Sequence, residues 1–433
     1  MSRVRTFSNA QALFVGPSPS SGYHFLTSGG TPTGLTALPV VNSGLALPSG
    51  AFNSIKQING LTSLSYDITT DRKDIKELGR KSNVDRAHVN HPSINLDFSY
   101  YGLDLRNEIR LGFNVNFPTG TNKTPYFSKN FEVPVFSGFT SRSTGAAYLN
   151  RSAWPYNDRD RRNFFVSIAP EGVDAVNNPN FLNSHLIGFG DCHIKSYSVA
   201  FAVGDFITQD VSYTSENIVF YLSGSGQIPA ANPKDLEQIN NNIFAVPQYK
   251  GQIVGKSVLK ATDVSFDIIS TGYGSTSSDI KDLGFNASDI KVQSASISVE
   301  FERQELKGLG YRASVDRIII NPILVNLSVE ALVGEDQEGK LRNLLVKDYD
   351  YNVTLKIASP TDYCKDAAPN DIVVRYDFLK AKFNSIKYSN TVNEAKGVVI
   401  DFTAEITDDV TGRGLYISGK VFETGNLFSG FNF

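Results

Sequence analysis

Apolar and polar residues alternate strictly along several stretches of the chain. Between 294 and 302, Ala295, Ile297, Val299 and Phe301 are separated at every second position by serine or glutamate. A period of two places alternate side chains on opposite faces, so this stretch is predicted to be a half-buried strand. Further strands of this kind are predicted at 94–100, 325–331, 195–203, 211–216, 383–388 and 398–405. The pattern predicts a mainly β fold of antiparallel sheets.

Helical spacing occurs in one short piece in each half of the chain. Leu341, Leu344 and Leu345 stand at i, i+3 and i+4, and Leu105 and Ile109 stand four apart. Such spacing is typical of a short helix that buries one stripe. One helix packed on the sheet is therefore expected in each half.

One segment of the sequence occurs twice. Residues 72–86 read RKDIKELGRKSNVDR and residues 303–317 read RQELKGLGYRASVDR, with seven of fifteen positions identical at an offset of 231. A repeated segment indicates a repeated structural unit. The sequence therefore predicts a tandem duplication of one module.

Later matches follow in the same order but at changing offsets. Asn114–Val115 align with Asn352–Val353 at an offset of 238, and Tyr213–Glu216 align with Phe402–Glu405 at an offset of 189. The fall of 49 predicts that the first copy holds 49 additional residues within 116–187. This insertion is expected to be a solvated surface excursion, with a ligand-binding loop as the open alternative.

The length of 433 residues allows two to four domains at roughly 150 residues each. Residues 1–50 form an arm rich in Gly, Ser and Pro, and the first module is assigned to 51–222 with its insertion at about 116–187. Residues 223–290 are assigned to a linker and a lead-in strand, and 291–433 to the second module. Gly- and Ser-rich segments of this composition cannot build a core of their own.

Composition excludes several classes of protein. The chain is 41% hydrophobic and 20% charged with a net charge of -3, which is typical of a globular protein and gives no reason to expect tight binding to DNA or to an anionic membrane. Cys192 and Cys364 are too few for a disulfide framework, and neither sits in a CxxC spacing that would indicate a zinc or redox site. No apolar run approaches the roughly 18 residues that span a bilayer, so synthesis in a reducing cytoplasm is expected.

Metal and cofactor sites are not expected. His88 and His91 stand three apart with no further ligands nearby. The acidic stretch that starts at Asp348 has Val353 where a calcium loop requires glycine and Ser359 where it requires glutamate. No cofactor is therefore predicted.

Catalysis is not expected either. Asp191, Cys192 and His193 are adjacent, but neighbours in a strand point to opposite faces and cannot act together as nucleophile and base. GxSxG, Walker A and GxGxxG motifs are absent, and five histidines leave little capacity for acid–base chemistry. The chain is predicted not to be an enzyme.

The repeated feature is a loop with the pattern Leu-Gly, four residues, Val-Asp-Arg between two strands. Glycine permits the positive φ of a tight turn, and the neighbouring Asp and Arg can pair locally or across an interface. Two interpretations stay open: an ion pair within the module that shapes the loop, or a contact with the next subunit. The candidate residues for ring stacking are Leu78, Gly79, Asp85, Arg86, Leu309, Gly310, Asp316 and Arg317.

The order of motifs resembles that of tail tube proteins of long-tailed bacteriophages. In chain order, the motifs are Ala12–Pro19, Ser63–Ile68, Arg72–Gly79, the Val-Asp-Arg at 84–86, Pro92, Leu96–Tyr101, Asn107–Glu108 and Leu111–Phe113. The second copy lacks the Asn-Glu and Leu-Gly-Phe motifs, and the 49-residue insertion is not part of a minimal tube module. Both departures bear on which tail component this chain is.

The resemblance implies two β-sandwich or barrel modules, each with a short helix and a long hairpin. It implies a structural virion protein that self-assembles into trimeric, pseudo-hexameric rings, which stack into the hollow tube through which DNA is ejected. Implied partners are copies of the chain, other tail proteins and DNA that passes without specific binding, with no membrane. The location would be the phage tail, assembled in the host cytoplasm. The resemblance leaves open whether a contractile sheath surrounds the tube.

Acidic residues on the polar sides of the expected strands are the candidates for the wall of the lumen. A neutral to acidic lumen would repel DNA and let it slide. These candidates are Asp97, Glu216, Glu300, Glu302, Glu330, Asp401 and Glu405. The alternative function is a receptor-binding, baseplate or decoration module, for which the aromatic residues Tyr126, Trp154 and Tyr156 of the insertion argue.

Overall fold

The fold is mainly β, as the alternation predicts. The computed structural model describes residues 11–17, 55–88, 91–113, 115–116, 161–169, 173, 175, 184–227, 229, 243–246, 258–261, 264–271, 291–320, 322–332, 349–358, 372–389, 397–406 and 413–419. Within these residues there are a 16-stranded sheet, three two-stranded sheets and the helix α1. Strand pairing is antiparallel except between β22 and the short β7.

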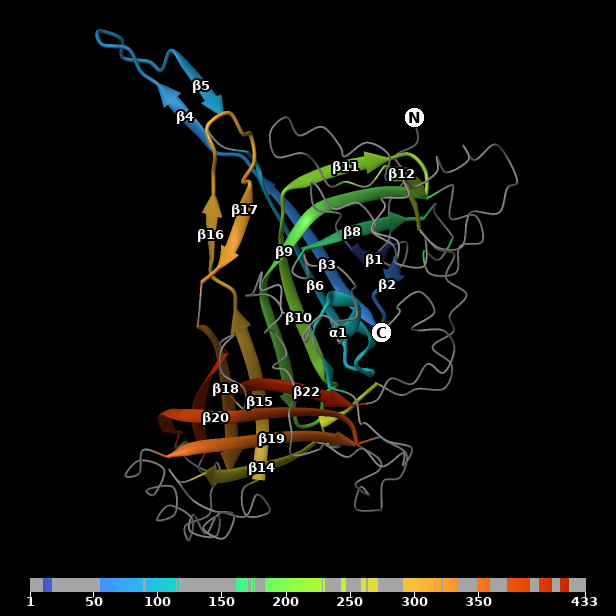
Figure 1. Cartoon of the computed structure of the whole chain (residues 1–433), viewed down its shortest axis with the longest axis vertical. Coiled ribbons are helices and arrows are strands. Elements are labelled where there is room, and N and C mark those ends of the chain that lie inside the picture. The colour runs from blue at the N-terminus through green and yellow to red at the C-terminus, as the bar shows by residue number, and fades with distance from the viewer. Residues whose placement is uncertain are drawn as a thin grey trace, which may run out of the picture.

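One continuous row of strands forms the centre of the molecule, in the order β20-β21-β18-β15-β9-β10-β6-β3 (Figure 1). We call it the central row. Its strands are β3 (Leu61–Thr69), β6 (Ser93–Tyr101), β9 (His185–Ala202), β10 (Thr208–Ser215), β15 (Lys291–Glu300), β18 (Ile323–Leu332), β20 (Ile372–Ser389) and β21 (Gly397–Ile406). The period of two is confirmed in β6, where alternate residues from Ile94 to Tyr100 are buried and those between them are half-buried.

Two groups of outer strands pack against the central row. The first consists of β1 (Gln11–Pro17), β8 (Arg161–Ile168), the first half of β9 and β11 (Asn217–Tyr221). The second consists of β14 (Val264–Thr271), β19 (Asp350–Ala358), the first half of β20 and β22 (Gly414–Gly419). Further short elements are β2 (Lys56–Gln57), β7 (Val115–Asn116), β12 (Ser225–Gln227) and β13 (Ile243–Ala245).

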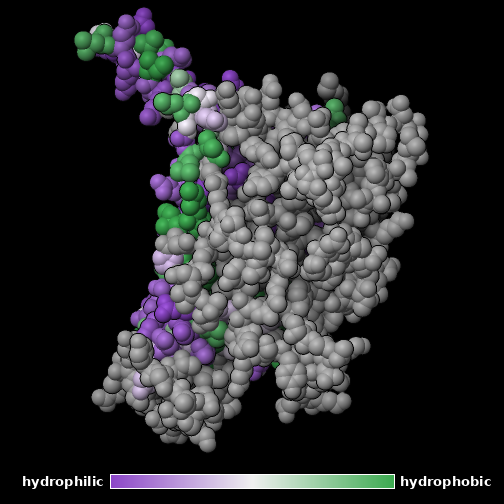
Figure 2. Space-filling view, viewed as in Figure 1, coloured by the Kyte–Doolittle hydropathy of each residue, from purple (hydrophilic) through white to green (hydrophobic). Residues whose placement is uncertain are grey.

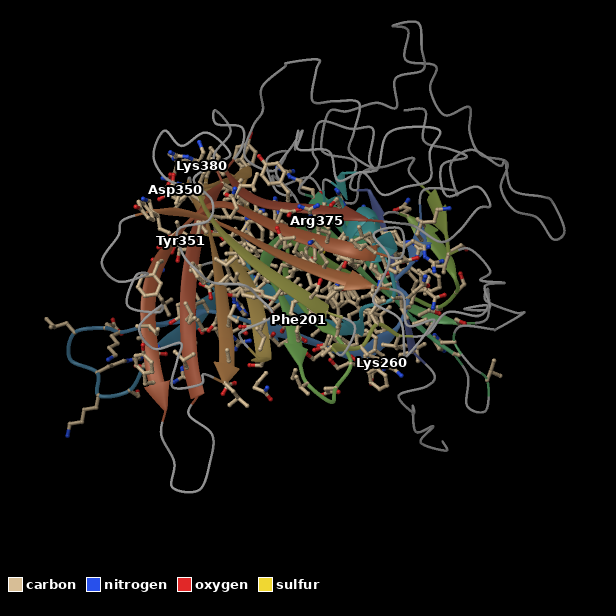
Figure 3. All side chains as sticks on the ribbon, turned by 90° about the horizontal axis from the view of Figure 1, so that it is seen from below. Phe201, Lys260, Asp350, Tyr351, Arg375 and Lys380 are labelled. Atoms are coloured by element: carbon tan, nitrogen blue, oxygen red, sulfur yellow. The ribbon has the colours of Figure 1, made fainter. Side chains whose placement is uncertain are left out.

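The long strands β9 and β20 belong to an outer group and to the central row at once. Asp191 in β9 and Lys380 in β20 have positive φ angles of 50° and 53°. Close to each of these residues the strand exchanges outer partners for partners in the central row. A bulge with a left-handed residue bends a strand in this way. Figure 3 shows Lys380 near Asp350 and Tyr351 at one end of the β19–β20 pair.

Aromatic residues fill the space between the outer strands and the central row. The ring of Phe164 in β8 lies 5.6 Å from Phe98 and 4.6 Å from Tyr213. Tyr351 in β19 lies 5.8 Å from Phe402 in β21. These side chains belong to one core that extends through both halves of the chain. Full burial of one such side chain contributes about 1.5–3 kcal/mol.

The short helix expected near Leu105 is present as α1 (Arg106–Leu111). Asp104 accepts hydrogen bonds from the backbone nitrogen of Arg106 at 3.1 Å and from its guanidinium at 2.7 Å, as an N-cap residue does. Gly112, with φ 93°, ends the helix in the left-handed conformation that glycine favours. The second expected helix, at 341–345, lies outside the described residues.

Two expectations about the insertion are wrong. Residues 161–168 were expected to lie in a solvated excursion, but they form β8, a largely buried strand paired with β1 and β9. The alignment of Val115 with Val353 also fails, because Val115 pairs in parallel with Ile417 whereas Val353 lies in an antiparallel strand between β14 and β20. Residues 117–160 of the insertion, including its aromatic residues, lie outside the described residues.

Candidate assembly surfaces

Two hairpins carry the repeated loop. The first is formed by β4 (Arg72–Ile75) and β5 (Asp85–His88), and the second by β16 (Arg303–Leu306) and β17 (Asp316–Ile319). The first hairpin projects away from the body of the molecule (Figure 1). Figure 2 shows apolar residues in green on this projection, among polar ones. Both hairpins therefore offer surface for contact with another molecule.

The tips of the hairpins hold the predicted Leu-Gly pairs. Leu78 and Leu309 are fully exposed to solvent. Gly79 and Gly310 have φ angles of 90° and 82°, which is the positive φ that the sequence predicts for this turn. The expected role of the tips in ring stacking stays a prediction.

In the first hairpin the repeated arginine pairs within the hairpin. Arg86 Nε donates to Asp74 Oδ1 at 2.7 Å, directly across from it in the β4–β5 pair. The adjacent Asp85 instead accepts a hydrogen bond from the backbone nitrogen of Arg86. Local pairing of the arginine is present, but its partner is the cross-strand aspartate and not the neighbouring one.

In the second hairpin the arginine makes an additional contact with the first half of the chain. Arg317 lies 3.0 Å from Glu305 Oε1 within its hairpin and 2.7 Å from Glu216 Oε1 at the end of β10. The hydroxyl of Ser314 also donates to Glu216 at 2.7 Å. The second hairpin is thus anchored to the first half, and Asp316 begins its strand β17.

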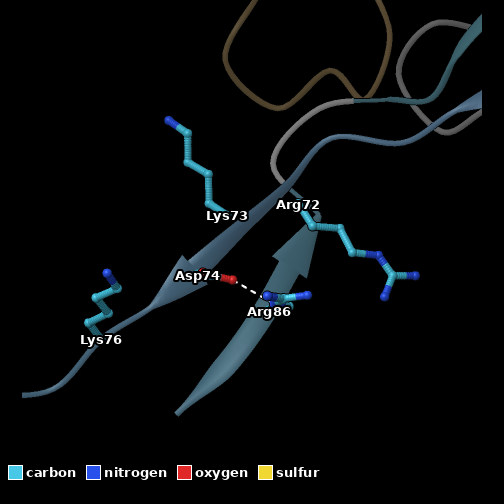
Figure 4. Close-up of a pocket in the computed structure, with 5 residues that line it drawn as sticks. All are labelled: Arg72, Lys73, Asp74, Lys76 and Arg86. Atoms are coloured by element: carbon cyan, nitrogen blue, oxygen red, sulfur yellow. Dashed lines mark hydrogen bonds and ion pairs between the residues drawn. The ribbon is translucent and has the colours of Figure 1, made fainter. Parts of the chain in front are cut away.

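The two arginines differ sharply in exposure. The side chain of Arg317 is 12% exposed and that of Arg86 is 66% exposed. A cavity of about 590 Å³ lies along the first hairpin, lined by Arg72, Lys73, Asp74, Lys76 and Arg86 (Figure 4). Four cationic side chains and one carboxylate produce a positive potential that favours an acidic group.

Five of the seven candidate lumen acids lie on the polar face of the central row. Asp97 stands opposite Ser212, Ser212 opposite Ser196, and Ser196 opposite Glu300, so these side chains share one face. Glu330 accepts a hydrogen bond from Ser294 at 2.9 Å. The five acids on this face are Asp97, Glu300, Glu330, Asp401 and Glu405.

The ionised form of Asp401 is stabilised by neighbouring side chains on this face. It accepts hydrogen bonds from Ser385 at 2.6 Å and from Ser328 at 2.7 Å. Partial burial opposes ionisation, but these hydrogen bonds and the charge of Lys387 outweigh it and lower the pKa of Asp401. Asp401 is therefore ionised near neutral pH and sustains the negative potential of the face.

The other two candidate acids lie elsewhere. Glu302 follows the end of β15, where it is exposed and its carbonyl accepts a hydrogen bond from Ile320. Glu216 is mostly buried against Arg317. The sequence interpretation also missed Asp67 and Asp210, which stand opposite the polar-face residues Asn95 and Ser99 of β6 and so lie on the polar face. Alternation in these two strands was the signal that could have identified them.

The region around Cys192 is a buried core segment. Burial raises the pKa of the Cys192 thiol and lowers the pKa of His193, so both groups are neutral at physiological pH. The thiolate that acts as a nucleophile is therefore not formed there. Among the described residues, no three His, Cys, Asp or Glu side chains cluster closely enough to hold a metal ion. In the same part of the chain, no helix has the length and apolar character to cross a bilayer.

Comparison with known proteins gives limited information. No protein-family profile matches the sequence, and no curated protein matches it. Among solved structures, a chain from "Cryo-EM structure of the anti-feeding prophage (AFP) baseplate, 6-fold symmetrised" is similar to 28% of this chain over 81% of its own length, with 11% identity and a TM-score of 0.20. A likeness of this size carries no functional argument.

Proposed function

We propose that this protein is the structural subunit of a phage tail tube, built from two copies of one β module that assemble into stacked rings. The observation that carries the proposal is the junction between β9 and β15. There, the last strand of one four-stranded group pairs edge to edge with the first strand of a second group that has the same order. The chain thus contains within itself a joint of the kind that would repeat around a ring.

The matching order of strands supports a duplicated module. In the central row, β3-β6-β10-β9 is followed by β15-β18-β21-β20, with a hairpin inserted after the first strand of each group. Outside the row, β1-β8-β9 has the counterpart β14-β19-β20. Each group then resembles a β-sandwich in which one long strand joins the two layers.

Residue offsets support the same interpretation. Tyr213 stands opposite Leu96, and Phe402 stands opposite Leu327. Tyr213 and Phe402 are 189 residues apart and Leu96 and Leu327 are 231 apart, so the strand pairing reproduces the two offsets found in the sequence. The bulge residues Asp191 and Lys380 are also 189 apart. Corresponding bulges at corresponding positions are expected for two copies of one unit, because bulges persist in related folds.

Two properties favour a closed ring over a solitary molecule. Among the described residues, β3 at one end of the central row pairs only with β6, and the second half of β20 at the other end pairs only with β21. Unpaired strand edges pair with strands of other molecules unless they are covered. Closure of the sheet around a lumen removes such edges. The acidic polar face would line that lumen and repel DNA, which favours sliding over binding.

The proposal assigns the chain no catalytic activity. Its partners would be copies of itself and other tail proteins, and DNA would pass through the lumen. Electron microscopy of the purified protein tests it, because hollow striated tubes are expected. Isolated particles that bind cell-surface glycans, with no tubes at any protein concentration, would support the receptor-binding alternative instead.

A further inference from the structure

We infer that the free edge of β3 pairs, antiparallel, with the second half of β20 in a second copy of this chain, in one defined register. In that register Tyr66 lies opposite Tyr388, Asp67 opposite Lys387 and Ile68 opposite Ile386. The contact also brings Arg86 of one copy to Glu405 of the other. This inference rests on the proposed function and specifies its subunit contact.

The β9–β15 junction provides the template. Ile297 stands opposite Val199, Ser298 opposite Ser198 and Val299 opposite Tyr197. Beyond the paired strands, the junction continues through the second hairpin, where Arg303 Nε donates to the carbonyl of Ile194 at 3.2 Å. The Arg317–Glu216 ion pair adds a further contact on the same side. Strand pairing and hairpin docking thus form a single interface.

The two free edges are the counterparts of the two strands in this junction. Tyr66 in β3 is equivalent to Ile297 in β15, because Tyr66 pairs with Leu96 and Ile297 pairs with its equivalent, Leu327. In the same way Ile386 faces Ile400 as Tyr197 faces Val211. Transfer of the β9–β15 register to β20 and β3 then fixes which residues meet.

The side chains that meet in this register are complementary. Tyr66, Ile68 and Tyr388 are large hydrophobic residues left exposed at the two edges, and they would cover one another. On the polar face, Asp67 would lie opposite Lys387, a pair of opposite charges. Pairing of β3 with β3 in the copy would instead bring Asp67 close to its own counterpart. Charge therefore favours a head-to-tail contact, which closes into a ring when the rotation permits.

The first hairpin supplies the second part of the contact. Arg86 corresponds to Arg317, and Glu405, at the equivalent place in β21, corresponds to Glu216. Arg86 is largely exposed, and Glu405 is exposed and forms no ion pair within the described part of the chain. The positive cavity beside Arg86 would receive the Glu405 carboxylate, as Arg317 receives Glu216.

Charge reversal tests the hairpin contact. Arg86→Glu alone and Glu405→Arg alone are each expected to weaken self-association about tenfold or more, as measured by sedimentation velocity. The double variant Arg86→Glu with Glu405→Arg is expected to restore it. Glu330→Arg is the matched control, because it makes the same charge change on the same face away from the free edges. Single variants that associate like the wild type would overturn the hairpin contact.

Cysteine cross-linking tests the strand register. Directly opposed residues of antiparallel strands have Cα atoms about 4.5–5.5 Å apart, within reach of a disulfide. Tyr66→Cys with Tyr388→Cys in one chain is expected to yield a ladder of disulfide-linked oligomers after mild oxidation. Asp67→Cys with Tyr388→Cys is the matched control, since its thiols would lie on opposite faces of the sheet.

The outcomes separate this inference from the proposed function. Tubes in the electron microscope without the cross-linked ladder, or with equal cross-linking of the control pair, would overturn the register and leave the tube intact. A wild-type chain that stays monomeric at every concentration would overturn both. Wild-type protein under the same oxidation gives the background from its native cysteines, of which Cys192 is buried.

Discussion

Arg317 and Glu216, which belong to different halves of the chain, form an ion pair with an Nε to Oε1 distance of 2.7 Å. Sequence interpretation gave them separate roles, one in ring stacking and one in the lumen wall. The pair instead fixes the second hairpin to the end of β10, and only 12% of each side chain is exposed. Arg317 is thus a structural residue of the subunit, whereas its counterpart Arg86 remains accessible.

Replacement of the two arginines should therefore have different effects on stability. Arg317→Ala leaves the mostly buried carboxylate of Glu216 without its guanidinium, and we expect a loss of about 3 kcal/mol in the free energy of unfolding. Arg86→Ala breaks an exposed pair and should cost less than about 1 kcal/mol. Urea unfolding of the dissociated protein measures both. Equal losses for the two variants would contradict the assigned roles.

The exposed leucines of the hairpin tips should matter for assembly and not for folding. Leu78→Asp and Leu309→Asp alter side chains that are fully exposed, so the free energy of unfolding should change by no more than about 0.5 kcal/mol. If the tips contact the next ring, tubes of either variant will be shorter or absent in electron micrographs. Tubes of normal length in the double variant would remove this role from the tips.

Glu108 should make stability depend on pH. Its carboxyl group is fully buried in α1, and this burial, with a smaller effect of the charge of Asp104, raises its pKa from 4.5 to about 8. The folded state therefore holds a proton that the unfolded chain releases at lower pH, so this contribution to stability declines as pH rises from about 4.5 to about 8. Glu108→Gln abolishes the titration.

We expect the stability of Glu108→Gln relative to wild type to increase across that pH range and to level off above it. Urea unfolding at pH 5, 6.5 and 8 measures the difference. A difference that is constant with pH would show that Glu108 titrates normally.

Two glycines with similar φ angles should respond differently to alanine. A Cβ at Gly112 would lie 1.5 Å from Nη2 of Arg162, a buried side chain with little room to move. Gly112→Ala should therefore cost about 3 kcal/mol or more. A Cβ at Gly79 meets nothing within 4 Å, so Gly79→Ala should cost only the backbone strain of about 1–2 kcal/mol. Thermal unfolding of both variants tests the contrast.

The sequence by itself determined the class of fold and several strands in each half. The alternation in 94–100 and 325–331 depends on which face of a strand is buried, and β6 and β18 follow it. The glycines at 79 and 310 depend on local backbone geometry, and both have the positive φ expected. Features that depend only on residues close together in the chain can be predicted from one sequence.

Only the tertiary structure decided which strands lie side by side. The sequence of β8 does not show that this strand pairs with β9. Residues of the insertion were therefore assigned to a surface excursion. Nor does the sequence show that β9 and β20 bend at Asp191 and Lys380 to join two layers, or that Arg317 meets Glu216. Alternation with a period of two shows which face of a strand is buried, but it does not show which segment covers that face. The covering segment depends on packing between parts of the chain that are far apart in sequence.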